Sequence, residues 1–154
     1  MTALWVKDTR VFVHKESINN NTAQLDNIFL ETTFKNKTLS SVTQAGLINN
    51  LNDGMMWGLL PIVLLSLNYN NENIGIITAI YPAVWGIGQL FTGKMSDIYP
   101  KKTMLFWGML LQGVAILFLP FSSSFVALAS ISAILGLGTA LVYPTFLSTI
   151  AQAT

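Results

Sequence analysis

The chain has 154 residues, of which 52% are hydrophobic and only 10% are charged, and its mean hydropathy is +0.54. A soluble domain carries about a quarter charged residues, so this composition excludes an ordinary soluble globular protein. With no cysteine the chain has no disulfide, no thiol nucleophile and no thiolate metal site, and its net charge of +1 gives no reason to expect a nucleic-acid partner.

Residues 1–42 form the polar part of the chain and hold five of its eight basic residues. The asparagine run at 19–21 favours a turn. Apolar residues near helical spacing follow it: Leu25, Ile28, Phe29 and Thr32. They suit a short helix that lies on the membrane surface, and a disordered linker is the alternative. In either form we expect a cytoplasmic segment next to the membrane.

Four apolar segments follow, and each is about as long as the roughly 20 residues that cross a bilayer as a helix. They cover residues 44–67, 73–92, 103–120 and 125–150. The links between them are short and rich in turn residues, so neighbouring helices should run antiparallel. The sequence therefore predicts an all-α, polytopic membrane protein with four transmembrane helices in residues 43–154.

The positive charges predict how these helices are oriented. All eight basic residues lie either in the N-terminal segment or in the 93–102 loop. The 68–73 loop carries only Glu72, and the 121–124 turn carries no charge. Because Lys and Arg near helix ends stay on the cytoplasmic side, we expect both termini in the cytoplasm, in a multi-pass protein of the cell membrane.

Asp53 is the one charged residue expected inside the bilayer, near its middle. It shares one face of its helix with Asn49 and Trp57. Two roles stay open for it. It binds a proton or a cation that drives transport, or it is a structural hub whose hydrogen bonds come from neighbouring asparagines.

Polar and aromatic residues also mark the second and fourth segments. Tyr81, Trp85 and Gln89 follow one another at four-residue steps, and Thr139 and Tyr143 lie on the last segment. Such faces line a polar cavity or pack between helices. Glycines that permit close helix approach are Gly86, Gly88, Gly93, Gly108, Gly113, Gly136 and Gly138.

No catalytic or metal site is expected in this chain. His14 is the single histidine, and without Cys or a carboxylate cluster it makes neither a metal site nor a triad. Gly136 and Gly138 lie within a hydrophobic helix instead of after a strand, so they do not form a phosphate loop. We therefore expect no enzyme and no cofactor.

The loop at 93–102 resembles the signature of the major facilitator superfamily of secondary transporters, which lies between the second and third helices of each six-helix half. The matching positions are Gly93, Asp97, Lys101 and Lys102, whereas Ile98 and Pro100 depart from the signature.

The likeness extends over essentially the whole chain. Residues 49–58 and 80–86 resemble the seventh and eighth helices of bacterial members, and residues 6–10 resemble the end of the sixth. By this resemblance residues 1–42 correspond to the end of helix 6 and the central cytoplasmic loop, and residues 43–154 correspond to about helices 7 to 10.

The resemblance implies a permease of small molecules that works by alternating access between two helical bundles, present here as an incomplete chain. Its partners would be a small-molecule substrate, protons as a candidate coupling ion, and the missing helices. The first and fourth helices would face the central cavity, the second would contribute to it, and the third would face lipid. The implied cavity residues are Asn49, Asp53, Trp57, Tyr81, Trp85, Gln89, Thr139 and Tyr143, and the implied gating loop is Gly93, Asp97, Lys101 and Lys102.

An alternative stays open beside this interpretation. A self-contained four-helix membrane protein could work as an oligomer, either as a small multidrug-type exporter or as a non-transporting partner. An acid inside the membrane in the first helix, such as Asp53, would suit the exporter.

Overall fold

The computed structural model describes residues 30–153, and every regular element among them is a helix. A π-helical turn, Glu31–Lys35, comes first. The predicted surface helix around Leu25, Ile28 and Phe29, together with the rest of residues 1–29, lies outside the described residues.

The first long element is built from three helical pieces that follow one another without a loop. They are α3 (Lys37–Gly54), a π-helical turn (Met55–Leu59) and α4 (Leu60–Ser66). α3 begins here because Asn36 Oδ1 accepts hydrogen bonds from the backbone N–H groups of Thr38, at 3.0 Å, and Leu39, at 3.2 Å. The π turn starts two residues after Asp53, and such turns often mark functional sites.

Three further helices complete the bundle: α5 (Asn71–Ile98), α6 (Lys101–Phe118) and α7 (Phe125–Ala153). Their spans 71–96, 101–121 and 125–150 are long and apolar enough to cross a membrane. This confirms the predicted fold class, an all-α polytopic membrane protein. The first predicted span, 44–67, corresponds to α3, the π turn and α4 together. It stays a prediction, since no single piece of it is both long and apolar enough.

The helices reach further than the sequence suggested at the predicted 93–102 loop. α5 continues to Ile98 and α6 starts at Lys101, so only Tyr99 and Pro100 link them. α5 ends here because the residue before a proline is disfavoured in the helical region, and Tyr99 is accordingly extended (φ −96°, ψ 152°). Lys94 therefore lies on a helix and not in a loop.

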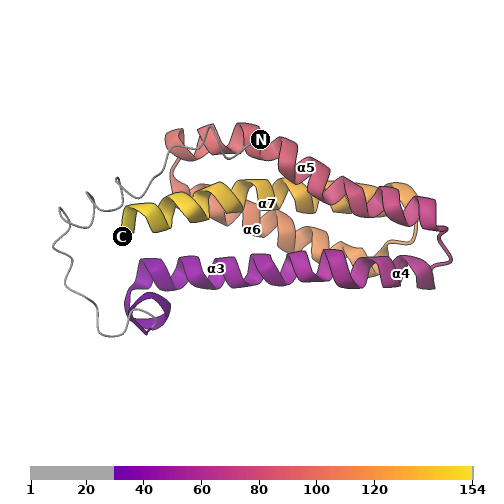
Figure 1. The fold of residues 1–154 in the computed structure, drawn as a ribbon, viewed down its shortest axis with the longest axis horizontal. Helices are drawn as coiled ribbons and strands as arrows, with labels where there is room; N and C mark the ends of the chain where they lie inside the picture. Colours follow the sequence, from indigo (N-terminus) through magenta and orange to yellow (C-terminus); the bar gives the residue numbers. More distant parts are fainter. Residues whose placement is uncertain (1–29, 154) are drawn as a thin grey trace, which may run out of the picture.

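Figure 1 shows the helices running lengthwise, with α7 among the others. Half of the membrane-spanning window of α7 is buried inside the molecule, against 11% for α5 and 22% for α6. The links between helices alternate from one end of the bundle to the other. A hydrogen bond that Tyr69 Oη donates to Ser123 O, at 2.8 Å, connects the two links at the right-hand end of Figure 1. α7 is therefore the helix on which the described part of the chain assembles.

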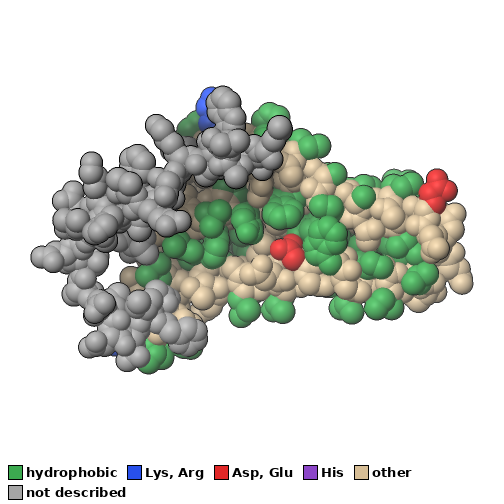
Figure 2. Space-filling view, viewed as in Figure 1, with side chains coloured by type: hydrophobic (Ala, Val, Ile, Leu, Met, Phe, Trp, Pro, Cys, Tyr) green, Lys and Arg blue, Asp and Glu red, His purple; other side chains and the backbone are tan. Residues whose placement is uncertain are grey.

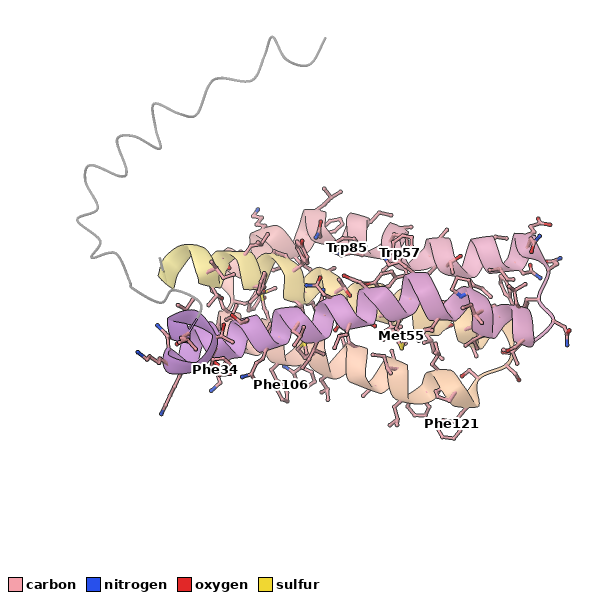
Figure 3. The ribbon with its side chains drawn as sticks, turned by 60° about the horizontal axis from the view of Figure 1, so that its bottom comes forward. Phe34, Met55, Trp57, Trp85, Phe106 and Phe121 are labelled. Atoms are coloured by element: carbon pink, nitrogen blue, oxygen red, sulfur yellow. The ribbon has the colours of Figure 1, made fainter. Side chains whose placement is uncertain are left out.

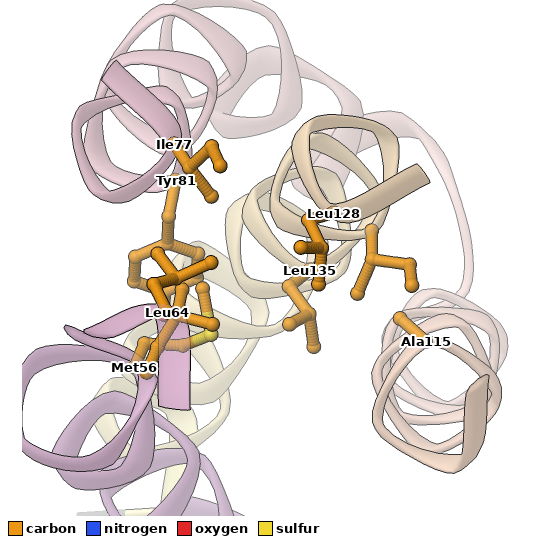
Figure 4. Packing of buried hydrophobic residues seen from close by; sticks show 9 residues of the cluster. Met56, Leu64, Ile77, Tyr81, Ala115, Leu128 and Leu135 are labelled. Carbon is orange, nitrogen blue, oxygen red and sulfur yellow. The ribbon is translucent and has the colours of Figure 1, made fainter. Parts of the chain in front are cut away.

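The apolar core lies in the half of the bundle that contains α4, and residues of α4, α5, α6 and α7 contribute to it (Figure 4). Its buried residues are Met56, Leu60, Leu64, Ile77, Tyr81, Ala115, Leu128, Ile131 and Leu135. Glycines allow α7 to approach its neighbours closely. A Cβ on Gly136 would lie 2.6 Å from Tyr81 O on α5, and one on Gly138 would lie 2.9 Å from Gly108 O on α6. Helices in membranes associate through such small residues.

The outer surface is apolar as well. Figure 2 shows hydrophobic side chains over the part of this face that is not drawn in grey, with few charged groups among them. On the α6 side, Phe106 and Phe121 are exposed and point away from the other helices in Figure 3, and Trp107 is also exposed. A soluble protein rarely exposes so much apolar surface, whereas lipid-facing helices require it.

Candidate functional site

A chain of hydrogen bonds inside the bundle connects side chains from four helices. Tyr81 on α5 donates its hydroxyl to the carboxylate of Asp53 on α3. The same hydroxyl lies 3.0 Å from Thr139 Oγ1 on α7. Gln112 on α6 donates from Nε2 to Thr139 Oγ1, at 3.0 Å, and to Asn49 Oδ1 on α3, at 2.8 Å. We call these five residues, Asn49, Asp53, Tyr81, Gln112 and Thr139, the polar network.

The polar network lies in the interior of the bundle. Asn49 and Gln112 are each 2% exposed, Tyr81 is 1% exposed, and Thr139 is fully buried. Because buried polar groups are costly without partners, their bonds to one another hold the four helices in one arrangement. The spacing of the α3 residues makes this geometry available, since Asn49 and Asp53 are four apart and lie on one helix face.

Asp53 is the half-buried end of the polar network, and its hydrogen-bond partner is the Tyr81 hydroxyl. No Lys or Arg of the described residues forms an ion pair with it, and no group of three or more His, Cys, Asp or Glu side chains occurs among the residues that the structure describes. A carboxylate without a counter-ion between apolar helices requires water, a bound cation or a proton. This arrangement is suited to bind and release a proton or a single cation.

Four aromatic rings follow the polar network along one side. Trp57 and Tyr81 are in edge contact with ring centroids 6.5 Å apart, and Tyr81 stacks on Trp85 at the same separation. Trp85 meets Tyr143 of α7 in an edge contact at 5.7 Å. Figure 3 labels Trp57 and Trp85, each of which contacts the ring of Tyr81. Trp57, in the π turn, is 58% exposed, so this row of rings opens to the surface at the Trp57 end.

A hollow of about 330 Å³ lies beside this open end, between the α3–α4 element and α5. Trp57, Pro61, Thr78 and Pro82 contribute to its walls. Its volume is at the lower limit of the range of about 300–1,000 Å³ that is usual for small-molecule sites. A second hollow of about 60 Å³ lies at the opposite end of the polar network, next to Asn49 and Tyr143.

Some buried polar atoms near the polar network have no hydrogen-bond partner among the described residues. They include Trp85 Nε1, Gln112 Oε1 and both side-chain polar atoms of Asn52. Buried groups of this kind are usually satisfied in native proteins. They are unused donors and acceptors on α3, α5 and α6.

The structure brings together most of the cavity residues predicted from the sequence. Asn49, Asp53, Tyr81 and Thr139 belong to the polar network, and Trp57, Trp85 and Tyr143 are linked to it by ring contacts. Gln89 is only partly buried on α5, and no hydrogen bond or ring contact among the described residues joins it to the others. Their roles as cavity residues stay predictions.

Gln112 is the member of the polar network that the sequence analysis missed. The resemblance assigned its helix, α6, to the lipid side, and one side of α6 is indeed exposed. Its other side carries Gln112 into the centre of the bundle. The signal was present in the sequence, because Gln112 is the only amide side chain in α6, and an isolated amide in an apolar helix seeks partners on other helices.

The four residues of the predicted gating loop are divided between two helices. Gly93 and Asp97 lie in the last turns of α5, and Lys101 and Lys102 open α6. Lys101 Nζ donates to Ser148 O on α7 at 2.8 Å, so it ties α6 to α7. Their gating role stays a prediction.

Comparisons with known proteins identify the family of this chain. A family model described as the Major Facilitator Superfamily matches residues 43–154. The chain is 33% identical over 90 residues to "Uncharacterized MFS-type transporter YvkA" of Bacillus subtilis (strain 168), an alignment that covers 56% of this chain and 20% of that relative. The chain therefore spans about a fifth of the length of the curated relative that it matches. No solved structure matches the chain.

Proposed function

The chain belongs to the major facilitator superfamily, and on this basis we propose that it forms part of a permease that moves small molecules across the cell membrane by alternating access. In such transporters the substrate path lies between two related helical bundles. The proposal includes the missing helices as partners, because the matched relative is about five times as long as the aligned part. Family membership also points to a transporter and not to an enzyme.

The observation that carries the proposal is the polar network with Asp53 at its half-buried end. An acid inside the membrane is expensive and marks ion or proton pathways. Asp53 has a hydroxyl partner and no described counter-ion, which suits a group that gains and loses a proton or a cation. We assign Asp53 the role of coupling site and Tyr81 the role of positioning it.

The aromatic row supports a role in substrate contact. Trp57 and Trp85 flank Tyr81, and the hollow of about 330 Å³ opens next to Trp57. A small molecule held against Trp57 would lie one ring away from the Tyr81 hydroxyl that bonds Asp53. Occupancy of the hollow would thereby be sensed at the coupling site.

The orientation in the membrane follows from the lysines. Lys37 and Lys101 stand at the first residues of α3 and α6, and Lys94 lies near the end of α5. These helix ends lie at the left-hand end of the bundle in Figure 1. Because positive residues are retained in the cytoplasm, we place this end and both termini there. The residues Gly93, Asp97, Lys101 and Lys102 would then gate the cytoplasmic side.

The first experiment tests whether Asp53 gains and loses a proton. Infrared difference spectra of the chain in lipid vesicles report the protonated carboxyl of an aspartic acid as the pH is changed. We expect a titrating carboxyl band that disappears in Asp53→Asn and shifts in Tyr81→Phe. Glu72→Gln is the matched control, since Glu72 is an exposed acid in the first turn of α5, and it should leave the band unchanged.

The second experiment measures transport of two probes, ethidium and radiolabelled glucose, in vesicles with an imposed proton gradient. The chain is tested alone and together with a six-helix N-terminal half and the remaining C-terminal helices. Gradient-driven movement only in the completed assembly, lost in Asp53→Asn and kept in Glu72→Gln, supports the proposal. Transport by the chain alone would refute this proposal and favour the alternative, a self-contained exporter that works as an oligomer. The chain has seven Asp and Glu side chains, so a carboxyl signal that is as large in Asp53→Asn as in the unmodified chain would refute the coupling role.

A further inference from the structure

A third hollow with a different lining lies at the lysine-bearing end of the bundle. Its volume is about 390 Å³, and it is enclosed by the first turns of α3 and α6 and the last turns of α7. Lys37, Lys101 and Lys102 line it together with the apolar side chains of Val42 and Leu105. None of the polar network residues contributes to its walls, so it is separate from the site proposed above.

The three lysines give this hollow a concentrated positive charge. Lys101 Nζ is held by its hydrogen bond to Ser148 O. Lys37 and Lys102 are exposed, and neither forms an ion pair with a carboxylate among the side chains that the structure describes. Like charges repel when they face one hollow, and an anion between them relieves that repulsion. The charge therefore points to an anionic ligand.

The remaining walls and the position of the hollow narrow the choice of ligand. Val42 is 4% exposed and Leu105 is partly buried, so the inner part is apolar. The membrane-spanning part of α6 begins at Lys101, which places the opening at the level where lipid headgroups meet the hydrocarbon. Basic pockets between membrane helices on the cytoplasmic side suit anionic headgroups.

We propose that this hollow binds an anionic phospholipid, whose phosphate lies between Lys37 and Lys102 and whose acyl chain runs along Val42 and Leu105. The lipid bridges α3 and α6, which are otherwise joined mainly through α7. It stabilises the lysine-bearing end of the bundle without contact to Asp53. The site would thus make the protein sensitive to the anionic lipid content of the membrane, independently of what it transports.

The test counts bound lipid by native mass spectrometry of the chain in detergent micelles. The chain is titrated with phosphatidylglycerol or with phosphatidylcholine that carries the same acyl chains. We expect one phosphatidylglycerol to bind in preference to phosphatidylcholine. Each lysine near an anionic surface contributes about 1 kcal/mol, so Lys102→Gln should weaken binding about 5-fold and the pair Lys37→Gln and Lys102→Gln about 30-fold.

Matched variants separate a built site from general surface charge. Lys94 is also an exposed lysine at this end, but it does not line the hollow, so Lys94→Gln should leave phosphatidylglycerol binding unchanged. The charge-keeping pair Lys37→Arg and Lys102→Arg should retain it. If the Gln pair loses helix content in far-UV circular dichroism, the single Lys102→Gln variant and the Arg pair decide the question.

Several outcomes would overturn the proposal. Equal binding of the two lipids, or an equal loss in Lys94→Gln and Lys102→Gln, would mean that no lipid site exists here. Displacement of the lipid by millimolar inorganic phosphate would identify a site for free anions. A dimer that excludes lipid would assign the hollow to a second copy of the chain.

Discussion

Replacing Gly136 with alanine tests the contact that brings α7 against α5. An added Cβ would lie 2.6 Å from Tyr81 O, 3.1 Å from Val84 Cβ and 3.2 Å from Trp85 N. Two of these three atoms belong to the backbone of α5, so no rotation of a side chain relieves the contact. The helices must separate locally, and the Tyr81 hydroxyl would move away from Thr139, its 3.0 Å partner.

The expected magnitude follows from two opposing effects. Overpacking of a well-packed interface costs about 1–3 kcal/mol. Alanine in place of glycine within a helix returns about 0.5–1 kcal/mol. We therefore expect Gly136→Ala to lower the free energy of unfolding by up to about 2.5 kcal/mol, with a central value of about 1 kcal/mol. Gly86 is the matched control on α5, because a Cβ there meets nothing within 4 Å, so Gly86→Ala should be neutral or stabilising by up to about 1 kcal/mol.

The assay is unfolding of the chain in mixed micelles by increasing the fraction of sodium dodecyl sulfate. Far-UV circular dichroism follows the helices, and tryptophan fluorescence follows the four indole rings of the chain, Trp57 and Trp85 among them. The two variants should differ by about 2 kcal/mol, with Gly136→Ala the less stable. Equal stability of Gly136→Ala and Gly86→Ala would refute the close approach of α7 to α5.

Three further variants test individual ties between helices. Gln112→Leu removes two buried hydrogen bonds, and the same titration should show a loss of about 1–2 kcal/mol; an unchanged midpoint would contradict the polar network. Thr92→Val removes the 2.6 Å bond from Thr92 Oγ1 to Ala140 O and should cost about 0.6 kcal/mol, the average for such bonds in membranes; stabilisation would show that the bond is absent. Lys101→Gln loses its tie to Ser148 O, so hydrogen exchange should become faster in the last turns of α7, and unchanged exchange there would contradict that role.

The residues of the candidate site could be predicted from single helices, but their connections could not. The spacing of Asn49 and Asp53 identifies a polar face, because residues four apart lie on one side of a helix. Periodicity says nothing about which helices meet. Gln112 was therefore missed, although it is the side chain that joins Asn49 to Thr139.

The helix boundaries were harder to predict near the lysines. Charge marks where the membrane ends, and the sequence analysis took it to mark where the helices end. α5 passes through Lys94 and stops only at Ile98, before the helix-breaking Pro100. Hydrogen bonds within the backbone continue a helix into water as long as no residue interrupts them.

The close-packed glycines are a third feature that could not be predicted from the sequence. The sequence treats all of them as candidates for close packing, yet a Cβ on Gly86, Gly93 or Gly113 would meet nothing within 4 Å. On Gly108, Gly136 or Gly138, by contrast, an added Cβ would lie less than 3.0 Å from a backbone oxygen of a neighbouring helix. Only the arrangement of helices distinguishes the two groups, since a helix's own sequence does not say which of its residues meets another helix.

The central position of α7 has a consequence for how the protein is made. Chains are synthesised and enter the membrane from the N-terminal side, so α3, α5 and α6 arrive before the helix that they pack against. Two pairs can form in that interval, Tyr81 with Asp53 and Gln112 with Asn49, and each shields polar atoms from lipid without help from α7. Thr139 then links the two pairs when α7 inserts. The polar network thus divides assembly in the membrane into two stages. If the ribosome stalled before α7, the polar groups of the earlier helices would be paired, but the apolar core would lack the residues that α7 contributes.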